Sequence, residues 1–151
     1  MTHEMIINTV NQMALAADLH DWILCRRCFA DEVIVDYTSM TGGESATIPA
    51  DALIESWQGL LPGFTATQHL IGTHAVNIHE DSAECQSHFQ AMHLLDDEQW
   101  ILGGHYHHRL QRTGESWQIT AITMTALWST GDGERLRALA AERSPNNALR
   151  G

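Results

Sequence analysis

The chain has 151 residues, of which 44% are hydrophobic, a composition typical of one globular domain with its own core. Its net charge of −11 excludes nucleic acid and anionic membranes as expected partners, because 8 basic residues stand against 19 acidic ones. No run approaches the roughly 20 apolar residues of a membrane helix. No basic-then-apolar leader is evident either, so we expect a cytoplasmic protein.

Apolar side chains at helical spacing predict helices in the first part of the chain. In the first helix, Asp18 falls at the edge of the apolar stripe and should point toward the core. Asp21 directly precedes an apolar run, so it is expected to cap the second helix rather than to take part in chemistry. The expected helices of this part cover residues 5–19, 22–30 and about 49–61.

Alternating apolar and polar residues predict a short strand and then four long ones. Short polar turns separate the long strands, the first of them at residues 79–82. The alternation changes side at Gly72, which predicts a β-bulge there. The expected strands cover residues 32–37, 66–79, 83–95, 99–112 and 116–129.

This order of elements predicts one α+β domain over residues 1–143, with a curved antiparallel sheet packed on the three N-terminal helices. A last helix is expected over 133–143, and a flexible tail over 144–151. Strands of this length must bend around the helices. The sheet would then form a half-open, cone-shaped barrel with an apolar pocket for a small molecule.

His69 and His93 are the first candidates for chemistry in this pocket. A hairpin folded near residue 81 pairs positions whose numbers sum to about 162, as 69 and 93 do, so the two imidazoles should face each other. Such a pair can transfer protons near neutral pH. A carboxylate beside an imidazole fixes its tautomer, and Asp18 is the carboxylate available. A purely structural Asp–His pair remains the alternative.

Tyr37 and Tyr106 are further candidates, because a phenol can polarise a carbonyl or protonate a departing hydroxyl. Each tyrosine could equally belong to the core. Gly104, Tyr106 and His108 share one face of a strand. The residues expected to contact the substrate are Met40, Trp57, Phe89, Gly104, His108 and Met124.

No metal or cofactor is expected. The run at 105–108 holds three histidines, but it lacks the glutamate and the later histidine of a cupin-like site, and no H-E-x-x-H occurs. Cys25 and Cys28 form one CxxC without a second ligand pair, so packed thiols are expected. Removal of a proton next to a carbonyl and loss of a β-hydroxyl as water need only acid–base groups.

Several segments resemble the nuclear transport factor 2-like superfamily, most closely its scytalone dehydratase-like and polyketide cyclase-like (SnoaL-like) branch. The most specific of them is Thr67-Gln68-His69-Leu70-Ile71-Gly72. The resemblance spans about residues 5–130 and implies a cone-shaped α+β barrel with a cofactor-free dehydratase site. Because members are commonly dimers or trimers, it also implies a homo-oligomer. The other segments that carry it are residues 17–22, 35–37, 91–93, 104–106, 116–119 and 127–128.

The resemblance also implies roles for individual residues. Asp18 would orient a catalytic histidine, and His69 and His93 would form the acid–base pair. Tyr37 would help to polarise the substrate carbonyl. On this basis we expect His93, oriented by Asp18, to take the proton.

The chain departs from the dehydratase pattern in two respects. Ala17 stands where that pattern has a second tyrosine, and Gly104 and Tyr106 stand where it has serine and asparagine. Tyr106 could supply the missing phenol and, like His69, assist the loss of water. The sequence thus predicts a hydro-lyase acting on a hydroxylated cyclic ketone or polyketide-like compound. Ketosteroid-isomerase-like isomerisation, polyketide cyclisation and a non-catalytic binding or assembly role remain alternatives.

Overall fold

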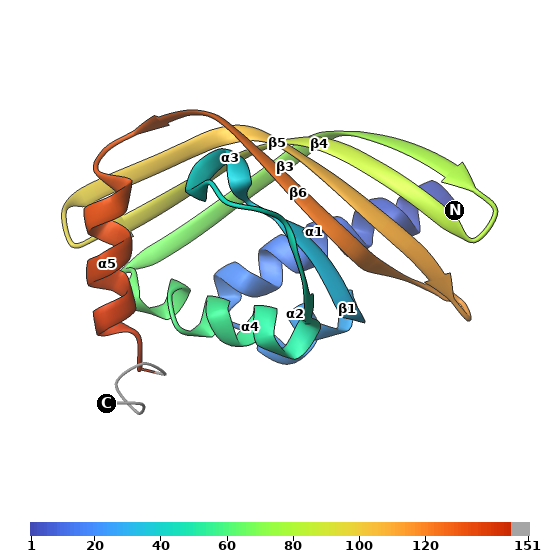
Figure 1. Ribbon diagram of the computed structural model, residues 1–151, viewed down its shortest axis with the longest axis horizontal. Helices are drawn as coiled ribbons and strands as arrows, with labels where there is room; N and C mark the ends of the chain where they lie inside the picture. Colours follow the sequence, from blue (N-terminus) through green and yellow to red (C-terminus); the bar gives the residue numbers. More distant parts are fainter. Residues whose placement is uncertain (146–151) are drawn as a thin grey trace.

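The computed structural model describes residues 1–145 and forms a strongly curved six-stranded sheet with α-helices beneath its concave face (Figure 1). The strand order is β2-β1-β6-β5-β4-β3, and β3 to β6 form an antiparallel meander. The predicted α+β cone is therefore confirmed. No helix within residues 1–145 is long and apolar enough to cross a membrane.

The helical elements are α1 (Thr2–Leu19), α2 (Trp22–Arg27), α3 (Thr38–Thr41), α4 (Ala50–Gln58), the 3-10 turn η1 (Leu61–Gly63) and α5 (Gly133–Arg143). The strands are β1 (Phe29–Asp36), β2 (Ala46–Pro49), β3 (Ala66–His79), β4 (Ser82–Leu95), β5 (Glu98–Thr113) and β6 (Ser116–Thr130). The four long strands and the last helix lie where they were predicted, to within a residue. The sequence did not predict α3 or β2, and α2 ends earlier than expected because β1 already begins at Phe29.

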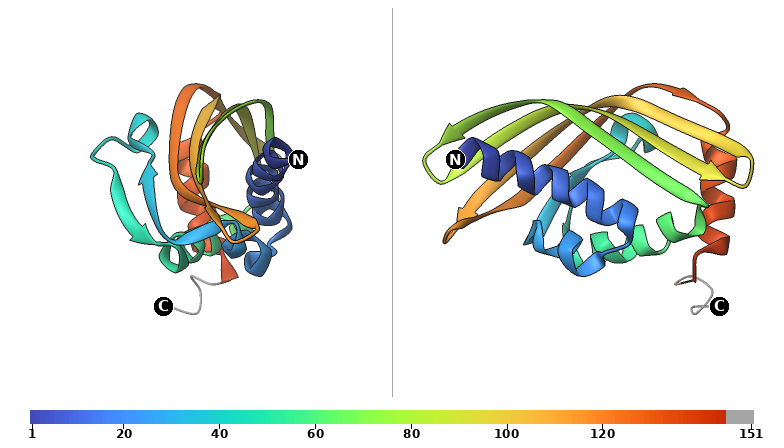
Figure 2. Two further views of the ribbon diagram at one scale, coloured as in Figure 1. Left: turned by 90° about the vertical axis from the view of Figure 1, so that its right-hand side faces the viewer. Right: turned by 180° about the vertical axis from the view of Figure 1, so that it is seen from behind.

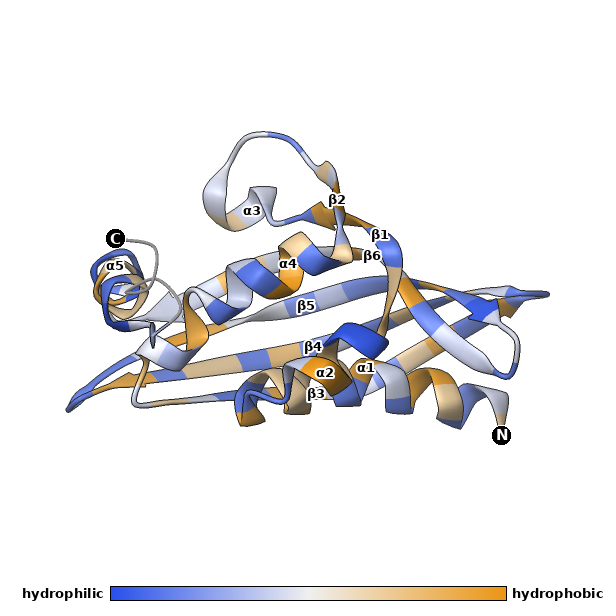
Figure 3. Ribbon diagram, turned by 90° about the horizontal axis from the view of Figure 1, so that it is seen from below, coloured by the Kyte–Doolittle hydropathy of each residue, from blue (hydrophilic) through white to orange (hydrophobic). Residues whose placement is uncertain are grey.

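The first two helices form for the reasons that the sequence suggested. The apolar stripe of α1, including Ile6, Val10 and Met13, is buried against the sheet. Asp21 caps α2, since its side chain accepts a hydrogen bond of 3.1 Å from the backbone N–H of Leu24. Viewed from below, α1 runs along β3, while α4 lies on the side of β1 (Figure 3).

A β-bulge interrupts β3 between Gly72 and Ala75, as predicted. Thr73 within it has a φ of 54°, in the left-handed region. Ile71 before the bulge and Val76 after it both pack against the core, although their numbers differ in parity. The bulge thus lets one long strand bend while it keeps its apolar side on the helices.

Helix α5 closes one end of the cone, where it packs against η1 (Figure 2). Ser144, assigned by the sequence to a flexible tail, is instead fully buried and donates a 2.7 Å hydrogen bond to the carbonyl oxygen of Gln58. Residues 146–151 of that predicted tail lie outside the described residues. The contact with α5 is tight at Gly63, where a Cβ atom would lie 1.7 Å from the carbonyl oxygen of Ala140.

Gly63→Ala should therefore lower the free energy of unfolding by about 1–3 kcal/mol, because the added methyl group must push α5 away. Gly72→Ala is the matched control, since a Cβ atom there meets nothing within 4 Å, and it should change stability by less than about 0.5 kcal/mol. Urea unfolding measures both variants. Equal stability of the two would contradict the tight contact.

Candidate active site

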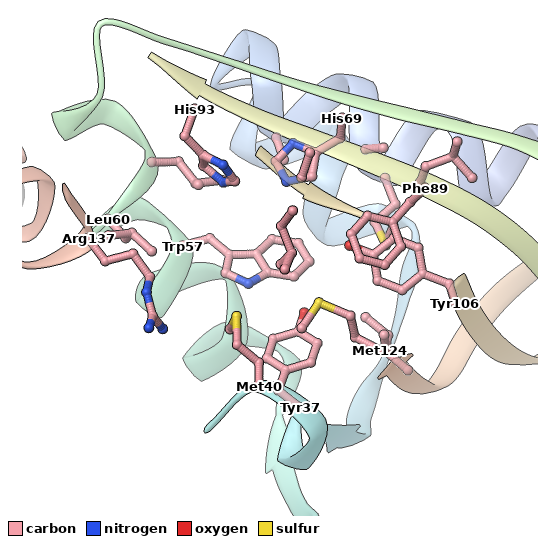
Figure 4. Close-up of a pocket in the computed structure, with 18 of the residues that line it drawn as sticks. Tyr37, Met40, Trp57, Leu60, His69, Phe89, His93, Tyr106, Met124 and Arg137 are labelled. Atoms are coloured by element: carbon pink, nitrogen blue, oxygen red, sulfur yellow. The ribbon is translucent and has the colours of Figure 1, made fainter. Parts of the chain in front are cut away.

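A cavity of about 320 Å³ lies between the concave face of the sheet and the helices (Figure 4). A cavity of about half this size can hold a benzene ring, so there is room for a molecule of one or two rings. Its walls are mostly apolar and aromatic. They include four of the residues that the sequence placed there, which are Met40, Trp57, Phe89 and Met124.

The carboxylate of Asp18, one residue before the end of α1, holds His69 from β3. Its Oδ1 lies 2.7 Å from Nδ1 of His69, and its Oδ2 accepts a 2.7 Å hydrogen bond from the His69 backbone N–H. The hydroxyl of Thr67 donates a further 2.9 Å bond to Oδ1. Burial alone would raise the pKa of Asp18, but the hydrogen bonds and the charge of His69 outweigh it and lower that pKa below its usual value.

This contact fixes the chemical role of His69. With Nδ1–H donating to the carboxylate, the lone pair of the neutral ring is on Nε2. The ring lines the cavity, and its side chain is 17% exposed. His69 is therefore arranged as a general base whose protonated form the negative charge of Asp18 would stabilise.

The prediction that Asp18 orients His93 is wrong, and so is the predicted register. Thr67, rather than His69, lies opposite His93, and His69 lies opposite Ala91. The expected hairpin pairs residues whose numbers sum to about 162. The two-residue turn and the bulge in β3 each reduce that sum by one, so that it is 160 at His69. The imidazoles are still neighbours along the diagonal, with ring centroids 5.7 Å apart.

His93 is held as a neutral ring. It is 6% exposed and stacks on Trp100 at 4.1 Å between ring centroids, with Phe64 at 5.0 Å. Burial, together with the charge of His69, lowers its pKa to about 4. Its Nδ1 lies 3.2 Å from the Trp100 carbonyl oxygen, an acceptor, so Nδ1 carries the hydrogen and the lone pair of the neutral ring is on Nε2. At neutral pH, His93 is thus an acceptor for a substrate hydroxyl rather than a cationic acid.

Tyr37 and Tyr106 both line the cavity, so the structure brings together the four cavity-facing candidates for catalysis. Burial raises the pKa of each phenol, and Trp57 contributes a hydrogen bond to Tyr37. Both hydroxyls therefore stay protonated at neutral pH and can donate. Tyr106 is also fixed by stacking on Phe89, with centroids 4.3 Å apart.

Two predicted substrate contacts, Gly104 and His108, do not line this cavity. Gly104 packs on β6, where a Cβ atom would lie 1.9 Å from the carbonyl oxygen of Thr125. His108 lies behind Tyr106, with ring centroids 5.1 Å apart, and is fully buried. Within the described part of the chain neither of its ring nitrogens has a hydrogen-bond partner, and burial lowers its pKa to about 3. Of the three residues that were expected to share this strand face, only Tyr106 reaches the cavity.

Sequence reasoning missed Trp100 and Arg137, which also line the cavity. Trp100 shares the strand parity of Tyr106, so alternation along β5 could have identified it. Nothing in the sequence indicates that α5 folds back to bring Arg137 to the pocket. Among residues 1–145, no three His, Cys, Asp or Glu side chains are grouped so as to hold a metal ion.

The SnoaL-like domain family model matches residues 2–123. Among solved structures, the Kfla4162 protein from Kribbella flavida is 28% identical, with a TM-score of 0.83 over 90% of this chain and 96% of that chain. No curated protein sequence matches the chain.

Two further similar structures show the shared fold. One, from Novosphingobium aromaticivorans, is provisionally described as a scytalone dehydratase and has 18% identity and a TM-score of 0.75 over 87% of each chain. The other is the hexachlorocyclohexane dehydrochlorinase LinA type 3 from Novosphingobium barchaimii, with 11% identity and a TM-score of 0.70 over 87% of this chain and 90% of that chain.

The buried neutral histidines make stability depend on pH. His93 and His108 take up protons below their ordinary pKa of 6.5 when unfolded, but only near 4 and 3 when folded. The unfolded state therefore binds more protons as the pH falls below 6.5, and each group should lower the folding constant by up to about tenfold per pH unit. Unfolding measured from pH 7 to 4.5 should show this loss.

His108→Phe should reduce the slope of the unfolding free energy against pH by the equivalent of about one proton. His79→Gln, which changes an exposed histidine next to the turn, should leave that slope unchanged. The slope is informative even if the phenylalanine changes the absolute stability. An unchanged slope in His108→Phe would contradict the depressed pKa.

Proposed function

The chain belongs to the SnoaL-like domain family, and we propose that it is a cofactor-independent hydro-lyase acting on a hydroxylated cyclic ketone or polyketide-like molecule. The observation that carries this proposal is the Asp18–His69 contact at the wall of a ligand-sized apolar cavity. A carboxylate-oriented imidazole is a suitable base for a carbon acid. The mostly apolar walls suit a cyclic hydrocarbon skeleton.

In this mechanism, Nε2 of His69 removes the proton from the carbon next to the substrate carbonyl. The electron pair moves onto the carbonyl oxygen, and the phenol of Tyr37 or Tyr106 donates a hydrogen bond to the resulting enolate. The enolate then expels the β-hydroxyl group. A proton from the His69 imidazolium converts the departing hydroxide to water and restores the base.

His93 has a different role from the one that the sequence suggested. Its neutral ring offers Nε2 to the hydrogen of the substrate hydroxyl and so orients the leaving group. It is not the acid of this mechanism, because its lowered pKa leaves almost no imidazolium at neutral pH. The acid is the proton that His69 has just taken.

The similar structures support elimination chemistry in general terms. One carries the provisional description of a scytalone dehydratase, and another is named for the loss of hydrogen chloride. Both reactions remove a proton and a leaving group from neighbouring carbons. At these identities the likeness concerns the fold, so the proposal depends on the residues of this chain.

A second candidate is isomerisation or cyclisation at the same kind of carbonyl. It uses the same base and the same phenols but needs no acid for a leaving group. The neutral ring of His93, which supplies no proton to a leaving group, is compatible with this candidate as well. A non-catalytic assembly role would fit a filled pocket better than a cavity of about 320 Å³.

His69→Asn should lower kcat/KM by a hundred- to ten-thousandfold, on the order expected for a lost general base. The test substrate is a β-hydroxy tetralone, whose dehydration gives a fluorescent naphthol. Asp18→Asn should lower kcat/KM in the same direction, because the imidazole loses its orienting charge. His88→Asn is the control, since His88 is exposed on β4 and should retain wild-type turnover. Full activity of His69→Asn would refute the base assignment.

Product mass separates the two candidate reactions. Dehydration should give a product lighter than the substrate by one water, whereas isomerisation leaves the mass unchanged. In deuterated water, both reactions should exchange the proton next to the carbonyl in wild type but not in His69→Asn. Exchange without any loss of water would support the isomerase.

A further inference from the structure

Most arginines within residues 1–145 lie beside carboxylates. The basic residues of the chain are arginines, and seven of them fall within residues 1–145. Two of those seven have no carboxylate partner in the described part of the chain: Arg27, which is exposed on α2, and Arg137 on α5. The arginines paired with Asp or Glu are Arg26, Arg109, Arg112, Arg135 and Arg143.

Arg137 is unusual because it lines the active-site cavity. Its guanidinium carbon lies 5.3 Å from the centre of the Trp100 ring, and its Nε donates a 3.3 Å hydrogen bond to the carbonyl oxygen of Gly133. Within residues 1–145, its two terminal nitrogens have no hydrogen-bond or ion-pair partner. This half-buried fork, in an otherwise apolar wall, has the geometry that binds a carboxylate through two parallel hydrogen bonds.

We propose that Arg137 binds an anionic group of the substrate, so that the natural ligand is a cyclic, largely apolar carboxylate or an equivalent planar anion. The inference rests on the proposed function only in taking this cavity as the substrate site. It adds a substrate class and a specificity-determining residue that the acid–base chemistry does not require.

The arrangement of rings and charges supports one orientation of such a ligand. Successive contacts lead from Arg137 to Trp100 at 5.3 Å and to His93 at 4.1 Å. They continue to His69 at 5.7 Å and end at Asp18, 2.7 Å from it. A cation and a carboxylate thus lie at opposite ends of a row of aromatic rings. Within residues 1–145, the two histidines between them contact no carboxylate other than that of Asp18.

An anionic group would be repelled at the Asp18 end and attracted at the Arg137 end. Figure 4 shows Arg137 and Leu60 on one side of the cavity and Phe89 and Tyr106 on the other. A ligand anchored by its anion at Arg137 therefore extends its carbon skeleton past His69. This places the carbon acid, rather than the anion, beside the base.

The net charge of −11 does not oppose this assignment inside the cavity. Surface charges beyond about 10 Å are largely screened at ordinary ionic strength. The partly desolvated guanidinium is close to the ligand and acts through a lower dielectric. The local cation therefore decides which ligands the cavity prefers.

A structural role for Arg137, as a cover for Trp100, makes a different prediction. Such a role needs the stem and the stacking but no preference for charged ligands. The test is binding of naphthoate and of its neutral isostere naphthamide at pH 7, measured by calorimetry. Wild type should bind naphthoate at least tenfold more tightly than naphthamide.

Arg137→Met should reduce that ratio to within about twofold, by losing naphthoate affinity while it retains naphthamide. Arg137→Lys, which keeps the charge but not the fork, should give an intermediate ratio. Arg27→Met changes the net charge equally and should keep the wild-type ratio.

Equal affinity for both probes in wild type, or no binding of naphthoate, would overturn the proposal. Loss of both probes in Arg137→Met and Arg137→Gln alike would also overturn it, as the signature of a structural cover. The binding ratio needs no turnover, so it is independent of the reaction. His69→Asn should keep the naphthoate preference even though it loses the base.

Discussion

The carboxylate of Asp18 is the contact on which the site depends, because it joins α1 to an edge strand. β3 is the last strand of the sheet, so the backbone N–H groups along its free edge have no strand partner. Asp18 satisfies the N–H of His69 with one oxygen and holds the ring of the same residue with the other. One side chain thus covers the sheet edge, fixes the helix against it and selects the tautomer of the base. A buried N–H left unpaired would cost about 1–3 kcal/mol, so position and chemistry are coupled.

The bulge in β3 makes that contact compatible with a curved sheet. An uninterrupted strand of this length would need one parity to face inward throughout. With the extra residue at Gly72–Ala75, His69 faces the cavity before the bulge while Val76 covers the core after it. The price is the left-handed backbone at Thr73. Together with the two-residue turn, the bulge places His93 diagonal to His69 rather than opposite it, and the neighbouring rings do not share the carboxylate.

These two features explain what the sequence could and could not predict. Strand ends, the bulge and the cap at Asp21 follow from alternation and local turn chemistry, which are short-range properties. The register at His69 does not, because an offset of one residue in the turn and another in the bulge add up over the hairpin. The partner of Asp18 depends on that register. The sequence analysis therefore assigned Asp18 to His93, whereas its partner in the structure is His69. Arg137 depends on where α5 returns to the sheet, which is set by tertiary contacts such as the packing of Gly63 against Ala140 and the hydrogen bond of Ser144 to Gln58.

The electrostatics of the cavity follow from the same packing. Burial keeps His93 and both phenols neutral, so the charges that act on a bound molecule are those of Asp18 and Arg137. If the cation lay next to the base, it would destabilise the imidazolium that forms when His69 takes a proton. Its separation from His69 by Trp100 and His93 leaves Asp18 to stabilise that imidazolium alone. The spacing of the two charges therefore allows one group to orient an anionic ligand while the other supports proton transfer, without either weakening the other.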